Sequence, residues 1–263
     1  MPQNMTKRTK IICTIGPSTE DFNSIKKLYE AGMNVARLNM SHCDHKTAKK
    51  IISRIKKLNG QIEHPVGILL DTQGPEIRTG DTSQVVDLEP GQLVSFTIRD
   101  EIDVETTSIR VNYDELIESV KVGTLITLDN GLLNFKVLKK TENELECRVL
   151  DGGKLGSKRH VNLPGIRINL PSITEKDKVD ISFGLKQDVD FIALSFVRDL
   201  SDISDLESLI KRQRKKVKII SKIEDREGLS NISDICSASD AVMVARGDLG
   251  IETDLSNLPN IQR

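Results

Sequence analysis

The stretch KIISKIEDREGLSNISDICSASDAVMV, residues 218–244, decides the fold class. It begins with a short β-branched run at 218–224 and ends with a second apolar run at 241–244. Two short apolar runs joined by a helical stretch are typical of a parallel β-α-β unit, whose strands are buried on both faces. We therefore predict strands at 218–224 and 241–244, with a helix at 225–238 between them.

The same alternation of apolar run and helix recurs along the chain before this unit. A capping-box pattern at 174–177 predicts one helix start, and Asp44 is a natural N-cap for another. Further strands are expected at 10–16, 35–40, 66–70 and 191–196, and further helices between Asp21 and Gly32 and at 46–58, 174–186 and 200–211. Six β-α repeats, the sixth ending within its helix, predict an α/β fold with a parallel sheet covered by helices.

Residues 81–160 have a different pattern. Short alternating segments are separated by the turn pairs Pro90-Gly91, Asn130-Gly131 and Gly152-Gly153, without a convincing helix. We predict that 81–160 is a separate all-β domain, inserted after the third strand between two parts of an α/β domain, 1–80 and 161–263.

Composition argues against several classes of function. The chain has 38 Lys and Arg against 39 Asp and Glu, a net charge of −1, so gross charge does not favour a nucleic-acid partner. Aromatic residues make up only 3%, which predicts an aliphatic core and few base-stacking surfaces. The longest apolar run, 241–245, is too short for a membrane span, and the first ten residues do not have the apolar centre of a signal peptide. Four scattered cysteines predict free thiols in a reducing cytoplasm.

The strand at 218–224 carries the sharpest indication of a site. A side-chain period of two places Lys222 and Glu224 on one face and Ile219 and Ile223 on the other. Charges on a buried parallel strand cost several kcal/mol unless they are paired or bind ions, as in a functional site. A structural Lys-Glu pair is the alternative.

A second carboxylate follows the last apolar run, in Gly247-Asp248-Leu249-Gly250. Glycines permit close backbone approach to an anion, and Asp248 with Glu224 forms an all-oxygen pair suited to Mg²⁺. An ordinary turn is the alternative for this segment.

Polar residues also follow the second and third strands: Asn39, Ser41, Asp71 and Thr72. One carboxylate among neutral oxygens suits a monovalent cation better than a transition metal. Considered without further information, these residues are more typical of helix caps and loop hydrogen bonds.

Two other motifs have plainer explanations. The Ser41-His42-Cys43-Asp44-His45 segment resembles a zinc cluster but precedes a helix, where a structural or substrate-facing His42 is the better interpretation. The basic run KRQRKKVK at 211–218 is interpreted as a solvated helix end, where cations favour the dipole, rather than a nucleic-acid patch.

Several long motifs, in order along nearly the whole chain, resemble the pyruvate kinase family. They are KIICTIGP at 10–17, GMNVARLNMSH at 32–42, LDTQGPEIRTG at 70–80, DNGL at 129–132, GSK at 156–158, VNLPG at 161–165, ISKIE at 220–224 and MVARGDLGIE at 243–252. The resemblance implies an incomplete TIM barrel, six of eight units, with a β-barrel domain inserted after strand three. It implies phosphoryl transfer from phosphoenolpyruvate to ADP, giving pyruvate and ATP in glycolysis with Mg²⁺ and K⁺, usually by a homotetramer.

The resemblance also implies roles for individual residues. Lys222 would be catalytic and would stabilise the transferring phosphoryl group, with Arg37, Gly247 and Asp248 binding substrate. Mg²⁺ would be held by Glu224 and Asp248, and K⁺ by Asn39, Ser41, Asp71 and Thr72. Nucleotide contacts would come from Asn39, His42, Arg78 and Arg159.

Some positions depart from the family pattern. Arg159-His160 stands where Lys-Gly is common, so a nucleotide contact would be a guanidinium, and Cys43 replaces the usual Gly. The family's strands seven and eight and its C-terminal domain have no counterpart in the sequence, so we expect this polypeptide alone to be marginal or inactive. A non-catalytic protein that binds nucleotide or phosphoenolpyruvate, and a metal-dependent aldolase-type barrel, are the alternatives.

Overall fold

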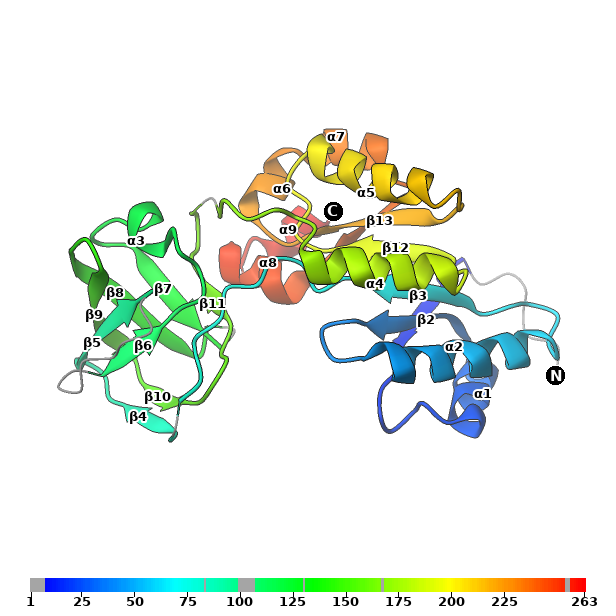
Figure 1. Cartoon of the computed structure of the whole chain (residues 1–263), viewed down its shortest axis with the longest axis horizontal. Coiled ribbons are helices and arrows are strands. Elements are labelled where there is room, and N and C mark those ends of the chain that lie inside the picture. The colour runs from blue at the N-terminus through cyan, green and yellow to red at the C-terminus, as the bar shows by residue number, and fades with distance from the viewer. Residues whose placement is uncertain (1–7, 83, 99–106, 130, 167, 254–255) are drawn as a thin grey trace. The chain divides into compact units, whose positions relative to one another are not determined.

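We describe a computed structural model of the chain, covering residues 8–82, 84–98, 107–129, 131–166, 168–253 and 256–263. The chain forms two compact units, each discontinuous in sequence (Figure 1). The first unit comprises Met1–Pro75, Pro171–Ile223 and Asn231–Met243. The second comprises Glu76–Leu170, Glu224–Ser230 and Val244–Arg263.

The first unit is built on one parallel six-stranded sheet with the strand order β1-β2-β3-β12-β13-β14. The strands are β1 (Ile11–Thr14), β2 (Met33–Asn39), β3 (Gly67–Asp71), β12 (Phe191–Leu194), β13 (Lys218–Ile223) and β14 (Ala241–Val244). All six predicted strands are present. The predicted fold class, an α/β fold containing a partial (β/α) barrel, is confirmed.

The register of this sheet brings the carboxyl ends of its middle strands together. Asn39 lies opposite Asp71, and Asp71 lies opposite Ala193. On the next strand pair, Leu194 lies opposite Ser221, the residue before Lys222. Polar residues that follow these strands are therefore neighbours, although they are distant in sequence.

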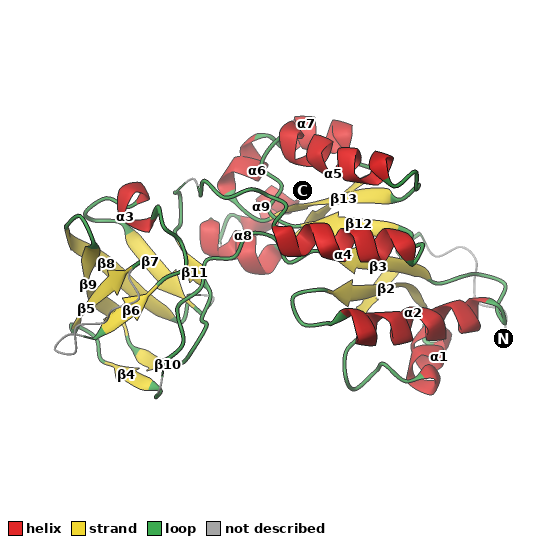
Figure 2. Ribbon diagram, viewed as in Figure 1, coloured by secondary structure: helices red, strands yellow, loops and turns green. Residues whose placement is uncertain are grey.

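Helices line this sheet, as Figure 2 shows in red. They are α1 (Phe22–Glu30), α2 (His45–Asn59), α4 (Glu175–Lys186), α5 (Leu200–Arg212) and α7 (Ile232–Ala238). The predicted caps are confirmed: the Asp44 side chain accepts a hydrogen bond from Thr47 N, and Thr174 with Asp177 forms a complete capping box. The apolar face of α2, including Ile51 and Ile55, is buried as amphipathic spacing requires.

The predicted continuous helix at 225–238 is wrong. The segment forms two helices, α6 (Arg226–Ser230) and α7, with Asn231 at the break. The Asn231 side chain donates a hydrogen bond of 2.8 Å to the carbonyl oxygen of Arg198. Arg198 lies outside the predicted helix, so a contact from elsewhere in the chain holds Asn231 where the helical hydrogen bonds are interrupted.

The second unit consists mainly of β-structure. A six-stranded sheet has the order β11-β7-β8-β9-β5-β6, and β10 pairs with β4. The strands are β4 (Val86–Leu88), β5 (Leu93–Thr97), β6 (Ser108–Arg110), β7 (Leu125–Leu128), β8 (Leu133–Lys140), β9 (Glu144–Asp151), β10 (Gly153–Leu155) and β11 (Val161–Asn162). The core is mostly aliphatic, with an edge-to-face contact of Phe96 and Phe135.

This unit also contains short helices, including one that the sequence analysis did not predict and those that follow the sixth strand, where a helix was expected. A one-turn helix, α3 (Leu116–Ser119), lies within the stretch predicted to have none. Four residues are too few to display a helical period, and α3 forms because Leu116 and Ile117 are buried in the core of the unit. After β14 come α8 (Arg246–Glu252) and α9 (Leu258–Gln262).

In the predicted turn pair Asn130-Gly131, Asn130 lies outside the described residues. Among the helices of the described residues, none has the length and apolar character to cross a membrane.

Gly74 provides a test of how tightly the ends of β3 and β12 pack. Its φ is 75°, and a Cβ there would lie 2.8 Å from Ser195 Cβ and 2.9 Å from the Phe196 ring. We expect Gly74→Ala to lower the free energy of unfolding by about 2–4 kcal/mol, from left-handed strain and overpacking together. Urea denaturation followed by circular dichroism measures the change. Gly32→Ala, at φ 113° with no atom nearer than 3.8 Å, is the control for strain alone, and an equal loss in both variants would contradict the packing argument.

Cys147, on β9, tests the core of the second unit. Burial raises the pKa of this thiol to about 12, while Cys236 is exposed. We expect Cys236 to react with a thiol reagent at pH 8 in the folded protein and Cys147 to react only after denaturant is added, because the thiolate is the nucleophile. Peptide mapping of the labelled sites measures this. Labelling of native Cys147 at the rate of Cys236 would show that the core of this sheet opens freely.

Candidate functional site

The buried carboxylate of Asp71 is the centre of a charged cluster at the carboxyl ends of the first unit's strands. Asp71, the last residue of β3, is 0% exposed. Its Oδ2 accepts a hydrogen bond of 2.6 Å from Arg37 Nε and lies 2.5 Å from Arg37 Nη2, a two-nitrogen contact. Arg37 Nη1 also donates to Thr14 Oγ1 at 2.8 Å. The guanidinium from β2 is thus fixed between β1 and β3.

Lys222, on β13, reaches the same carboxylate from the other side. Its ammonium lies 3.2 Å from Asp71 Oδ1 and donates a hydrogen bond of 2.7 Å to Ser195 Oγ. Lys222 is 9% exposed. Two cations therefore share one carboxylate at a largely buried position, so among these three groups positive charge is in excess. The one net positive charge of these three groups favours an anion, because the local dielectric is low.

Lys222 forms an ion pair that the sequence analysis did not predict. Within the first unit its partner is Asp71, and this contact does not test the structural pair with Glu224 that was the alternative in the sequence analysis. Asp71 was predicted as an oxygen donor for a cation, without a connection to Lys222. The register places β3 beside β12 and β12 beside β13, which brings the two residues together across β12.

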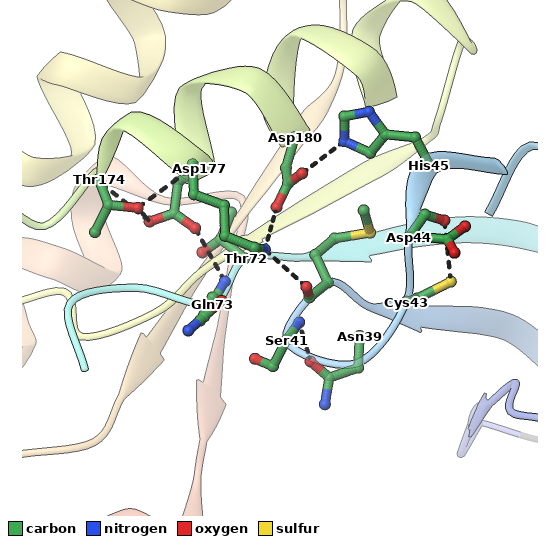
Figure 3. Close-up of polar contacts among 12 residues, drawn as sticks. Asn39, Ser41, Cys43, Asp44, His45, Thr72, Gln73, Thr174, Asp177 and Asp180 are labelled. Atoms are coloured by element: carbon green, nitrogen blue, oxygen red, sulfur yellow. Dashed lines mark hydrogen bonds and ion pairs between the residues drawn. The ribbon is translucent and has the colours of Figure 1, made fainter. Parts of the chain in front are cut away.

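Neutral oxygens lie beside the carboxylate. Asn39 Oδ1 accepts a hydrogen bond of 3.1 Å from Ser41 N, which folds the chain sharply after β2 (Figure 3). Thr72 is 1% exposed, and its hydroxyl and carbonyl oxygens both accept hydrogen bonds from Ser195, at 3.0 and 2.7 Å. Part of the loop hydrogen bonding that the sequence indicated is therefore present.

The two histidines after β2 have different surroundings. His42 is exposed, in a turn closed by its backbone N–H to Asn39 O at 3.1 Å. His45 contacts Asp180 Oδ1 through Nε2 at 2.6 Å and stacks on Phe183 with ring centroids 4.3 Å apart. His45 therefore joins α2 to α4, and Asp44 is the N-cap that was predicted.

The predicted nucleotide contacts Arg78 and Arg159 belong to the second unit, and both are paired with carboxylates. Arg78 donates to Glu76 Oε2 from Nε at 2.6 Å and to the carbonyl oxygen of Lys158 at 2.8 Å. Arg159 Nη1 lies 3.2 Å from Asp129 Oδ2, and its Nε is buried without a hydrogen bond. Both guanidinium groups are partly exposed, so each has surface left for a ligand.

The predicted magnesium ligands also lie in the second unit. Glu224 is 2% exposed, and Asp248 is half-buried in the first turn of α8. The Gly247-Asp248-Leu249-Gly250 segment is thus helical, not a loop. Gly247 is exposed, and a Cβ there would meet nothing within 4 Å, so packing does not explain this glycine. The described residues contain no group of three or more His, Cys, Asp or Glu placed to hold a metal.

His160, where the family pattern commonly has Gly, is a titratable group in the same unit. Burial lowers the pKa of His160, opposed by the negative charges of Glu76 and Asp248 and assisted by Arg78. The imidazole is therefore biased toward its neutral form near residues with predicted roles.

Sequence reasoning missed three groups: Ser195, which contacts Lys222 and Thr72, and Lys176 and Asp180, which contact the Met40 carbonyl oxygen and His45, respectively. Ser195 could have been found as a polar residue within an apolar run. Lys176 and Asp180 gave no such signal, because charged residues on a surface helix are common.

Comparison with known proteins identifies the family. The sequence profile described as "Pyruvate kinase, barrel domain" matches residues 6–263. The chain belongs to the pyruvate kinase family. It is 46% identical to plastidial pyruvate kinase 2 of Arabidopsis thaliana over 258 residues, which are 97% of this chain and 44% of that protein. It is 45% identical to pyruvate kinase isozyme G, chloroplastic, of Nicotiana tabacum, over 98% of this chain and 46% of the relative. It is 44% identical to a pyruvate kinase of Staphylococcus haemolyticus, over 98% of this chain and 44% of that protein.

The predicted family is therefore confirmed. The chain spans less than half the length of these pyruvate kinase relatives. The roles assigned to single residues stay predictions.

Removing the Asp71 charge tests whether this carboxylate holds the cluster together. We expect Asp71→Asn to lower the free energy of unfolding by about 3–5 kcal/mol, because two largely buried cations would lose their shared counter-charge. Denaturant unfolding monitored by circular dichroism measures this. Glu207→Gln, which breaks the exposed Lys211–Glu207 pair, should cost at most about 1 kcal/mol. Equal effects of the two substitutions would contradict the central role of Asp71.

Proposed function

We propose that the chain contributes pyruvate kinase chemistry: transfer of a phosphoryl group from phosphoenolpyruvate to ADP, giving pyruvate and ATP in glycolysis. The observation that carries the proposal is the Arg37–Asp71–Lys222 cluster. It concentrates positive charge at the carboxyl ends of parallel strands, where barrel enzymes bind their substrates.

The two cations suit the charge that moves in this reaction. Phosphoryl transfer depends on positioning and on neutralising charge that spreads over the phosphoryl oxygens. Asp71 and Ser195 hold the Lys222 ammonium in one place, so it needs little reorganisation when that charge develops. Arg37 is held by Asp71 and Thr14 and would orient a second anionic group of the substrate.

The oxygen-rich surroundings fit a monovalent cation such as K⁺. Asp71 Oδ1 is buried, lies 3.2 Å from the Lys222 ammonium and accepts no hydrogen bond from the described residues. The Ser41 side chain is partly exposed and so accessible to a ligand. With Asn39 and Thr72 these groups supply only hard oxygen ligands. When bound, K⁺ would add positive charge beside the substrate.

Glu224 and Asp248 are the residues that would hold Mg²⁺. Two carboxylate ligands fit this ion, which usually keeps waters and takes further oxygens from substrate phosphates. When bound, Mg²⁺ would neutralise phosphate charge. His42, Arg78 and Arg159 remain the proposed nucleotide contacts, and Gly247 a proposed substrate contact. The expected cytoplasmic location stays a prediction, since two of the relatives are named plastidial or chloroplastic.

Pyruvate formation coupled to lactate dehydrogenase, with Mg²⁺ and K⁺ present, tests the proposal. The rate of this polypeptide alone is expected to be low, and we expect Lys222→Met to lower it by about 10²–10³-fold, as for loss of one preorganised electrostatic contact. Lys218→Met, on the same strand but with an exposed side chain, is the matched control and should stay within about twofold.

Other outcomes separate the alternatives. A rate no higher than that of Lys222→Met, together with ADP or phosphoenolpyruvate binding by calorimetry, would favour the non-catalytic protein. Absence of ADP binding would revive the aldolase-type alternative.

A further inference from the structure

We propose that Lys176, together with Asp180 and His45, is a positioning group that sets the spacing of the oxygen ligands proposed for the monovalent cation. This inference rests on the proposed function, because it concerns the same four ligand residues. Its basis is a set of contacts between the start of α4 and the loops after β2 and β3, within the first unit (Figure 3).

Lys176 holds the loop after β2. Its ammonium donates a hydrogen bond of 2.8 Å to the carbonyl oxygen of Met40, the residue between Asn39 and Ser41. The Met40 backbone N–H donates in turn to the carbonyl oxygen of Asp71 at 3.0 Å. Any displacement of Met40 therefore moves Asn39 and Ser41 relative to Asp71.

Asp180 holds Lys176 in place. One turn further along α4, it is 3% exposed and accepts from the Lys176 ammonium at 2.7 Å through Oδ2. Its other oxygen contacts His45 at 2.6 Å, as Figure 3 shows, and the His45 ring stacks on Phe183 of α4. His45 begins α2, so both ends of the short segment between Asn39 and α2 are tied to α4.

The neighbouring residue Asp177 holds the second loop. Its Oδ1 accepts from the backbone N–H groups of Gln73 and Gly74, at 3.0 and 3.2 Å, directly after Thr72. Its Oδ2 accepts from Thr174, which closes the capping box (Figure 3). Adjacent residues of one helix thus fix the backbone beside each pair of ligand residues.

The same contacts also suggest which residue to test. Asp177 completes the capping box of α4, so its loss would weaken the helix whatever the cation does. Lys176 is half exposed at its side chain, and its contacts with Met40 and Asp180 lie outside the helical ladder. Replacing it leaves the capping box of α4 intact, and Asp180 keeps its contact with His45.

The experiment measures Tl⁺ binding to the purified chain by ²⁰⁵Tl NMR, with K⁺ and Na⁺ as competitors. We expect Lys176→Met to raise the Kd for Tl⁺ about tenfold, on the order expected for one lost charge-assisted hydrogen bond, and to reduce the preference for K⁺ over Na⁺. Lys176→Arg, which can donate to both partners, should restore most of the affinity. Lys178→Met, which removes an exposed ion pair with Glu175 on the same helix, should leave the Kd unchanged.

A merely structural role would lower the melting temperature of Lys176→Met equally with and without K⁺, and would not change ion preference. Equal Kd values for Lys176→Met and Lys178→Met, both folded by circular dichroism, would overturn the inference and leave the proposed function standing. Weakened binding in Lys176→Met, with no turnover by the unmodified chain, would support the inference and contradict the proposed catalysis. Absence of Tl⁺ binding by the folded, unmodified chain would overturn the inference.

Discussion

The carboxylate of Asp71 is the group on which the rest of the first unit's polar structure depends. It is buried at the end of β3 and contacts a guanidinium from β2 and an ammonium from β13. A buried charge of this kind is stable only while its partners stay in place, so three strands must keep one register at their carboxyl ends. The same arrangement leaves two cations on one anion. The constraint that holds the sheet ends together therefore also creates an attraction for anions.

Much of the fold could be predicted from the sequence because the alternation of apolar runs and amphipathic stretches is strong. All six sheet strands, the N-cap of α2 and the capping box of α4 depend on local patterns of a few residues. The break at Asn231 could not be predicted in this way, because a carbonyl group outside the segment holds that side chain. The short helix α3 was missed for a related reason, since burial in the β core stabilises it rather than any repeat in its four residues.

The candidate site also contains residues that local sequence predicts and contacts that it does not. Lys222, Glu224 and Asp71 were found because a charge at the end of a buried strand is unusual. The link between Asp71 and Lys222 depends on strand order, which a single β-α-β unit does not specify. Ser195, Lys176 and Asp180 support the site through contacts across 27 to 136 positions of sequence. Residue types alone do not encode such contacts, so positioning groups are harder to predict than the groups they position.

The insertion between β3 and β12 has a consequence for the order of folding. Pairing the ends of these strands, as in the contact of Ser195 with Thr72, joins residues 123 positions apart, which is a slow step for a free chain. The inserted β-structure closes on itself, since Arg159 N donates to Thr79 Oγ1 across 80 of those positions. Once that hydrogen bond and its neighbours form, only about a third of the loop remains to be closed, which lowers the entropic cost by about 1 kcal/mol. Early folding of the β-structure would therefore shorten the loop that has to close before β3 and β12 can pair.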